Sequence, residues 1–149
     1  MDIRRATREE LPQVAELFSA NGLAPLPTNP SLANVLLGLE QGSMVGVIAL
    51  DVVARFGLTR WLAVTTEHRG RGFARSLVQG LITRSQELGL RELYALPGGA
   101  KGFLEDLGFR SVAAGDVPRE IRRLPSYSYS GSDRETEGEI LCMTLETRV

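Results

Sequence analysis

One short basic segment of the sequence combines the residue types that bind phosphate groups. In 62–74, LAVTTEHRGRGFA, an apolar run leads into a glycine-rich turn and then into an amphipathic helix. The first turn of a helix offers backbone N–H groups without helical partners, and the helix dipole adds positive charge there. Gly70 and Gly72 remove Cβ atoms, so an anion can approach closely. Arg69 and Arg71 add charged donors, so the segment predicts a pyrophosphate cradle; the alternative is a solvated turn with two surface arginines.

Two common nucleotide-binding motifs do not fit this turn. A Walker A loop counted from Gly70 requires glycine and lysine where the chain has Arg75 and Ser76. The dinucleotide pattern GxGxxG has Arg75 in place of its third glycine. The turn therefore belongs to neither class.

Several charged residues beside apolar runs are candidates for handling an amine. Asp51 interrupts an apolar strand, so it either binds or deprotonates an ammonium group or marks a strand end in solvent. Arg60 either holds a substrate carboxylate or lies in solvent at a strand entry. Glu67 and Glu92 are weaker candidates for a general base, since such glutamates are usually solvated or paired.

The sequence predicts no metal site and no disulfide. His68, the only histidine, lies beside the glycine-rich turn without a cluster of cysteine or aspartate around it. Cys142 is the only cysteine, and its place in the last apolar run predicts a core residue. An oxidising compartment is therefore not required.

The composition indicates one globular domain over residues 1–149. The chain has 149 residues, of which 43% are hydrophobic and 23% charged. A net charge of −1 argues against nucleic acid and anionic membranes as partners. No signal peptide is visible, and the longest apolar stretch, 44–50, is too short to span a bilayer. We expect a soluble, cytoplasmic protein.

Strands and helices that alternate along the chain must position these residues. Thr7 and Glu10 predict a capping box before the first helix, and Asn21-Gly22 predict its end. The segments 23–31 and 127–138 are expected to be connections. The order predicts an α/β fold with a mixed sheet. Strands are expected at 3–6, 35–40, 44–53, 58–64, 92–96, 109–113 and 140–145, and helices at 8–20, 74–88, 100–107 and 118–123. The runs 35–40 and 44–53, separated by Gln41-Gly42-Ser43, predict a hairpin.

The turn and its surroundings resemble the GNAT superfamily of acyl-CoA N-acyltransferases. The cofactor signature of that family is (Q/R)-x-x-G-x-(G/A), and Arg69-Gly70-Arg71-Gly72-Phe73-Ala74 follows it. Downstream, 103–109, FLEDLGF, resembles the terminal F-Y-x-x-x-G-F region of the family. The likeness extends over the order of elements from Ile3 to Leu145.

The resemblance implies a fold, a co-substrate and a set of binding residues. The fold is a GNAT-like α/β (α+β) domain whose mixed, mostly antiparallel sheet has helices on its faces and a splayed strand pair at 62–64 and 92–96. Acetyl-CoA is the implied co-substrate; its pantetheine arm pairs with the first of these strands, and its pyrophosphate lies on the turn. The implied cofactor-binding residues are Leu62, Ala63, Val64, Arg69, Gly70, Arg71, Gly72, Phe73 and Ala74.

The chain departs from the family at the residue that commonly protonates the leaving thiolate. Many members have a tyrosine four residues before the glycine of LGF, and this chain has Leu104 there. Tyr94 on the neighbouring strand is a substitute, and the alternative is a packed tyrosine with its hydroxyl at the rim. The catalytic candidates are therefore Asp51, Tyr94 and Glu92, and the substrate-binding candidates are Arg60 and Asp51.

A narrower likeness is to a subgroup associated with arsenic-resistance operons, whose members acetylate the amino acid arsinothricin. The matching segments are LTRWLAV at 58–64, ELYAL at 92–96 and VPREIR at 117–122. Trp61 and Pro97-Gly98-Gly99 depart from the subgroup's serine and threonines. The likeness therefore suggests an amino-acid-like acceptor without naming it.

The resemblance predicts an acetyl-CoA-dependent N-acetyltransferase that acts on a primary amine of a small molecule by direct attack on the thioester. A non-catalytic acyl-CoA-binding domain is one alternative, since Leu104 lacks a hydroxyl. A protein or peptide N-acetyltransferase is another and requires an open groove. The expected oligomeric state is a monomer or a homodimer.

Overall fold

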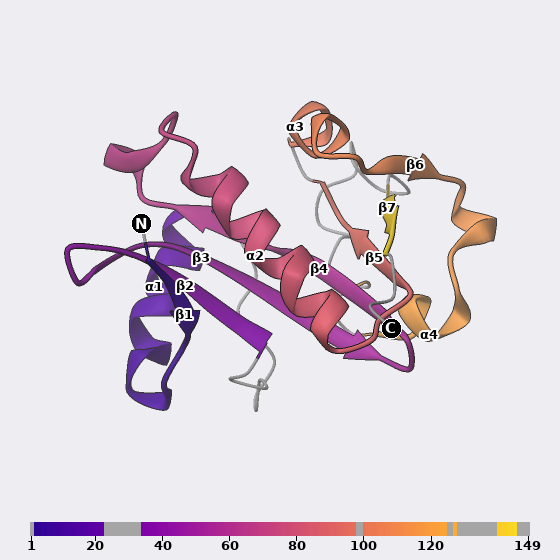
Figure 1. Ribbon diagram of the computed structural model, residues 1–149, viewed down its shortest axis with the longest axis horizontal. Helices are drawn as coiled ribbons and strands as arrows, with labels where there is room; N and C mark the ends of the chain where they lie inside the picture. The colour runs from indigo at the N-terminus through magenta and orange to yellow at the C-terminus, as the bar shows by residue number, and fades with distance from the viewer. Residues whose placement is uncertain (1, 23–33, 98–99, 125–126, 128–139, 146–149) are drawn as a thin grey trace. The chain divides into compact units, whose positions relative to one another are not determined.

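The strands and helices of the described residues follow one another along the chain as Figure 1 labels them. The computed structural model describes residues 2–22, 34–97, 100–124, 127 and 140–145, except the side chains of Arg60, Trp61 and Ala114. The chain divides into two compact units, Met1–Leu50 with Trp61–Arg84 and Asp51–Arg60 with Ser85–Val149. The elements are β1 (Asp2–Arg5), α1 (Leu11–Ala20), β2 (Val35–Glu40), β3 (Ser43–Val53), β4 (Phe56–Val64), α2 (Phe73–Glu87), β5 (Glu92–Ala95), α3 (Lys101–Asp106), β6 (Arg110–Val112), α4 (Arg119–Arg122) and β7 (Ile140–Thr144).

In the first unit, β1, β2 and β3 form an antiparallel sheet. Asp2 pairs with Leu39 in the first ladder, and Val35 pairs with Ala49 in the second. The β2–β3 hairpin turns at Gln41 and Gly42, whose φ angles are 51° and 81°. Two consecutive residues with positive φ are typical of a tight hairpin turn, and the expected hairpin is confirmed.

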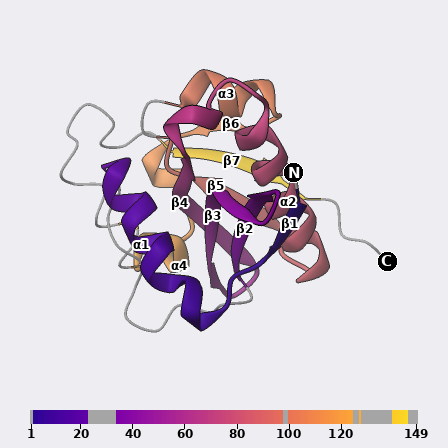
Figure 2. The same cartoon turned by 90° about the vertical axis from the view of Figure 1, so that its left-hand side faces the viewer.

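The two faces of this sheet pack against different helices, as Figure 2 shows for α1 and α2 on either side of β2 and β3. A Cβ atom added to Gly46 on β3 would lie 2.7 Å from Leu77 Cδ1 of α2 and 3.1 Å from the Ala63 carbonyl oxygen. A larger residue at position 46 would therefore force Leu77 and the strand around Ala63 to shift, so glycine allows the close packing of α2 on β3. The core toward α1 consists of Ala6, Val14, Phe18, Val35, Leu37, Val47, Ala49 and Ala63.

The second unit contains the parallel strand pair β4–β5 and the antiparallel pairs β5–β7 and β6–β7. The start of β4 pairs in parallel with β5 from Phe56 and Glu92 to Thr59 and Ala95. β5 pairs antiparallel with β7, and β7 pairs antiparallel with β6. A core cluster of this unit packs the segment around α4 against the strands. Its buried residues are Leu58, Tyr94, Val117, Ile121, Ile140 and Cys142.

The parallel ladder between β4 and β5 is shorter than β4 itself. Its last contact is the Leu96 N–H, which donates to the Thr59 carbonyl at 3.0 Å. β5 ends at Ala95, whereas β4 continues to Val64. The ladder thus ends where a splayed pair is expected.

The fold class expected from the sequence is confirmed: a mixed, mostly antiparallel sheet with helices. β4 begins at Phe56, earlier than the expected residue 58, because the chain turns at Ala54, whose φ is 52°. The expected connection 23–31 lies outside the described residues, as does 127–138 apart from Tyr127. In the described parts of the chain, no helix is long and apolar enough to cross a membrane.

The capping box expected at the start of the first helical segment is confirmed. The Thr7 N–H donates to Glu10 Oε1 at 2.9 Å, and the Glu10 N–H donates to the Thr7 carbonyl at 3.1 Å. Arg4 donates to both carboxylate oxygens of Glu10, at 2.7 and 2.6 Å. Hydrogen bonds from Arg4 and then from Thr7 lower the pKa of Glu10 to about 2. The carboxylate ties β1 to the helical segment.

We predict that Glu10→Gln lowers stability at neutral pH more than at acid pH. The folded pKa of about 2 lies below the ordinary value of 4.5. The carboxylate therefore contributes stability above about pH 4.5, and this contribution is lost as the pH falls through the folded pKa. Urea unfolding of the wild type, Glu10→Gln and the exposed control Glu9→Gln as a function of pH measures this. A destabilisation by Glu10→Gln that stays constant down to about pH 2 would contradict the interpretation.

Candidate functional site

The predicted phosphate cradle lies in the first unit, between the end of β4 and the start of α2. β4 ends at Val64, and the Thr65 N–H donates to the Val45 carbonyl at 2.9 Å. A short 3-10 turn, Thr66–His68, follows, and the exposed residues 69–72 then lead into α2. Of the implied strand residues, Leu62 is half-buried, while Ala63 and Val64 are buried.

The backbone of this loop requires its two glycines. Gly70 and Gly72 have φ angles of +79° and +82°, a conformation that L side chains rarely adopt. A Cβ atom at either position would meet nothing within 4 Å, so conformation and not crowding selects glycine. The Ser76 N–H donates to the Gly72 carbonyl at 3.1 Å. The N–H groups of residues 73–75 precede that bond, so the helix start can receive an anion.

The two arginines of the loop have different surroundings. Arg69 Nη2 donates to Asn21 Oδ1 at 2.6 Å, and its Nε donates to the Val64 carbonyl at 3.3 Å. Arg69 thus links the loop to the end of α1, and its role as a phosphate donor stays a prediction. Arg71 is exposed on the loop. Asn21 also caps α1, donating from Nδ2 to the Leu17 carbonyl at 2.8 Å.

His68 contacts residues on both sides of the loop 69–72. Its Nδ1 lies 2.6 Å from Thr65 Oγ1 in a hydrogen bond. Its Nε2 lies 3.7 Å from Glu40 Oε2 of β2. The His68 ring contacts the ring of Phe73, the first residue of α2, with centroids 5.6 Å apart. The contact between His68 and Phe73 thus joins the two ends of the loop 69–72.

A polar cavity of about 400 Å³ lies in the second unit. Its walls come from β5, β6 and β7 and from the 3-10 turn Ala114–Asp116. Tyr94 and Cys142 are paired across β5 and β7, and Cys142 pairs with Arg110 across β7 and β6. The polar lining residues are Glu92, Tyr94, Arg110, Ser111, Asp116 and Cys142.

Two polar side chains of this polar cavity are almost completely buried. Tyr94 is 2% exposed and Cys142 is 1% exposed. The Cys142 thiol donates to Glu92 Oε2 at 3.3 Å. Burial, and then Glu92, raise the pKa of Cys142 to about 11. Burial, with Cys142 and Glu92 nearby, also raises the pKa of Tyr94. Both groups therefore keep their protons at neutral pH.

The structure brings together some of the predicted catalytic residues. Glu92 and Tyr94 lie on one face of β5 and line the polar cavity. Asp51 is half-buried on β3 and does not belong to the lining of that cavity. The side chain of Arg60 lies outside the described residues. Leu104 is buried in α3, so the usual tyrosine position offers no hydroxyl. Among the described residues, no group of three or more His, Cys, Asp or Glu could hold a metal ion.

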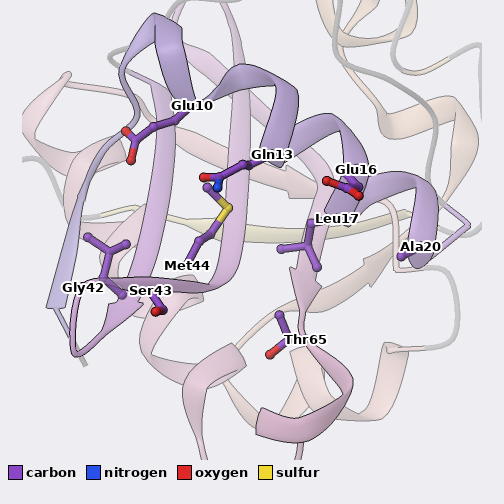
Figure 3. A pocket seen from close by; sticks show the side chains of 10 residues that line it. Glu10, Gln13, Glu16, Leu17, Ala20, Gly42, Ser43, Met44 and Thr65 are labelled. Atoms are coloured by element: carbon purple, nitrogen blue, oxygen red, sulfur yellow. The ribbon is translucent and has the colours of Figure 1, made fainter.

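A second hollow, of about 500 Å³, lies in the first unit between α1 and the β2–β3 hairpin. Figure 3 shows Glu10 just before α1, Gln13 and Glu16 along it, and Leu17 and Met44 between the two walls. We call this the α1 groove. Its ionisable lining residues are both acidic.

One comparison with known proteins identifies a family, and another identifies similar folds. The sequence model of the acetyltransferase (GNAT) domain matches residues 32–111, more than half of the chain. Among solved structures, N-acetylglutamate synthase from Neisseria gonorrhoeae, complexed with coenzyme A and N-acetyl-glutamate, matches with a TM-score of 0.78 and 21% identity. The match covers 97% of this chain and 35% of that one. This chain thus spans about a third of the length of the synthase.

Two further solved structures are similar over almost their whole length. Rv2747 from Mycobacterium tuberculosis, in complex with CoA and NLQ, has a TM-score of 0.77 and 19% identity, over 98% of this chain and 100% of that one. The ribosomal-protein-S18-alanine N-acetyltransferase from Escherichia coli has a TM-score of 0.66 and 16% identity, over 99% and 96%. No curated protein sequence matches significantly. At these identities the structures establish the fold.

We predict that Gly72→Ala weakens coenzyme A binding and that Gly102→Ala does not. An L side chain at φ +82° costs about 1–2 kcal/mol, or roughly a tenfold loss of affinity if the loop relaxes away from its binding conformation. Gly102 is the matched control, because a Cβ atom there also meets nothing within 4 Å and its φ is not left-handed. Titration calorimetry with coenzyme A measures both. Equal affinities for the two variants would show that the loop conformation is not needed.

We also predict that His68→Phe and Thr65→Val weaken coenzyme A binding through the same hydrogen bond. Each substitution removes one partner of the 2.6 Å contact, and phenylalanine keeps an aromatic ring beside Phe73. Loss of one hydrogen bond corresponds to about 0.5–1.5 kcal/mol, a few-fold in affinity. The double variant should be no weaker than either single variant. Strictly additive losses would mean that the two side chains act independently.

Proposed function

Because the chain belongs to the acetyltransferase (GNAT) domain family, we propose that it transfers an acetyl group from acetyl-CoA to a primary amine of a small molecule. Membership confirms the family resemblance and identifies the reaction class as acetyl-CoA-dependent N-acetyl transfer. It leaves the acceptor open, and the likeness to the arsenic-operon subgroup stays a prediction.

The geometry of the loop 69–72 carries the proposal. Its exposed, left-handed glycines let an anion approach the backbone, and the start of α2 supplies N–H groups without helical partners, as pyrophosphate binding requires. Arg71 would add a charged donor to the phosphates, and Arg69 would hold the loop in place through Asn21. These residues fit the pyrophosphate of acetyl-CoA.

The proposed reaction is one direct transfer. The acceptor ammonium first loses a proton to a base, for which Asp51 and Glu92 are the candidates. The amine nitrogen then attacks the thioester carbonyl and forms the C–N bond, and the C–S bond breaks. The leaving sulfur takes up a proton, for which Tyr94 is the candidate. The products are the N-acetyl amine and coenzyme A.

Two observations support a small acceptor. One similar structure holds N-acetyl-glutamate, which makes an amino-acid-like acceptor chemically reasonable for this fold. The polar cavity, at about 400 Å³, is at the small end of the range for ligand pockets, roughly 300–1,000 Å³. A peptide acceptor is the second candidate, favoured by the open α1 groove and by the likeness to the ribosomal-protein-S18-alanine enzyme.

The test is release of coenzyme A thiol from acetyl-CoA in the presence of amino acids, polyamines, other small amines and short peptides. Turnover with a small amine at much higher kcat/KM than with any peptide supports the proposal. A preference for peptides supports the second candidate. Coenzyme A binding without turnover on any acceptor favours the non-catalytic alternative.

We predict that Tyr94→Phe lowers kcat and leaves acetyl-CoA affinity unchanged. The ring packs edge-on against Phe56 with centroids 6.3 Å apart, so phenylalanine keeps the packing and loses only the hydroxyl. Loss of a general acid corresponds to a fall in kcat of about 10²-fold or more. Tyr127→Phe is the matched control, because Tyr127 packs against the same core. Equal kcat values for the two variants would remove Tyr94 from the mechanism.

A further inference from the structure

The polar cavity combines charges of both signs on neighbouring elements. Arg110 comes from β6, Glu92 from β5, and Asp116 from the 3-10 turn that follows β6. A cavity for a simple amine needs only carboxylates, and a cavity for a simple acid needs only a cation. The presence of both suits a ligand that carries an ammonium and a carboxylate together.

The floor of the cavity is polar although it is buried. Tyr94 and Cys142 are 2% and 1% exposed, and burial of a polar group without a hydrogen-bond partner is costly. The Cys142 thiol donates a hydrogen bond to Glu92 Oε2 at 3.3 Å. This carboxylate is also close enough to Tyr94 to raise the pKa of its hydroxyl. The three side chains therefore form one connected polar cluster that lines the cavity.

The register of the strands fixes Arg110 beside this floor. Arg110 pairs with Cys142 across β6 and β7, and Cys142 pairs with Tyr94 across β7 and β5. Arg110 itself is exposed, so its planar guanidinium can meet a carboxylate in a bidentate contact without prior burial of the charge. Asp116 is also exposed and can meet an ammonium group.

We propose that the polar cavity binds a small α-amino acid as a zwitterion, with Arg110 on its carboxylate and with Asp116 and Glu92 on its ammonium group. The inference rests on the proposed function, because it makes an amino acid the acceptor. It assigns Arg110 as the residue that distinguishes an amino acid from the corresponding amine. Lysine at 110 would keep the charge and lose the bidentate contact.

The test compares each proteinogenic L-amino acid with its decarboxylated amine in the thiol-release assay. We expect at least one amino acid to react, with its amine reacting at roughly one tenth of the kcat/KM or less, as loss of a bidentate charged contact predicts. Arg110→Met should raise the KM for the amino acid and leave the KM for the amine unchanged, and Arg110→Lys should restore part of the difference. Arg91→Met, another exposed arginine of the second unit, is the matched control.

The outcomes separate this inference from the proposed function. If simple amines react as well as amino acids, or if Arg110→Met changes neither KM, the amino-acid assignment is overturned while the N-acetyltransferase stands. If nothing reacts, titration calorimetry of the protein saturated with coenzyme A against the same amino acids decides. Binding that Arg110→Met abolishes and Arg91→Met retains supports the cavity assignment, and absence of binding overturns it.

Discussion

The left-handed backbone of Gly70 and Gly72 is the constraint on which the first unit's chemistry depends. With φ near +80° at both positions, the chain passes from β4 into α2 through a conformation that L side chains rarely adopt. Such a loop needs external support, because few bonds within it hold its shape. Arg69 supplies one anchor through Asn21, and His68 supplies the other through Thr65 and Phe73. Of the two arginines of the loop, Arg69 thus anchors it and Arg71 is exposed.

The second unit places polar groups where a core would normally be apolar. Tyr94 and Cys142 belong to the cluster that packs against Ile121 and Ile140, yet both also line the polar cavity. Glu92 accepts a hydrogen bond from the Cys142 thiol and so lowers the free-energy cost of burying that thiol. The packing of this unit and the chemistry proposed for its cavity therefore use the same side chains, which limits the substitutions that Tyr94 can accept without loss of either.

Local patterns in the sequence predicted much of the fold. The capping box at Thr7 and Glu10, the hairpin at Gln41-Gly42 and the glycine-rich entry to α2 depend on residues close in sequence, and each is found. The turn at Ala54 carried no such signal, since alanine rarely adopts a φ of 52° and nothing nearby indicates a turn. The α/β class with a mixed sheet followed from the order of the elements, and the mostly antiparallel arrangement followed from the family resemblance.

The side-chain contacts of the site could not be predicted in the same way. The Arg69–Asn21 bond joins residues 48 positions apart, and nothing in either segment indicates it. Grouping Arg110 with Cys142 and Tyr94 requires the register of three strands, which a shift of one residue would reverse. Cys142 was predicted as a core residue, which is confirmed, but its place in the polar cavity depends on that register.

The most direct test of the central claim compares coenzyme A with pantetheine, which lacks the pyrophosphate and the nucleotide, in calorimetric titrations of the wild-type protein. If the loop 69–72 holds the pyrophosphate, coenzyme A should bind and pantetheine should bind far more weakly, and added salt should weaken coenzyme A binding. Equal affinities for the two compounds would show that the loop is not the cofactor site.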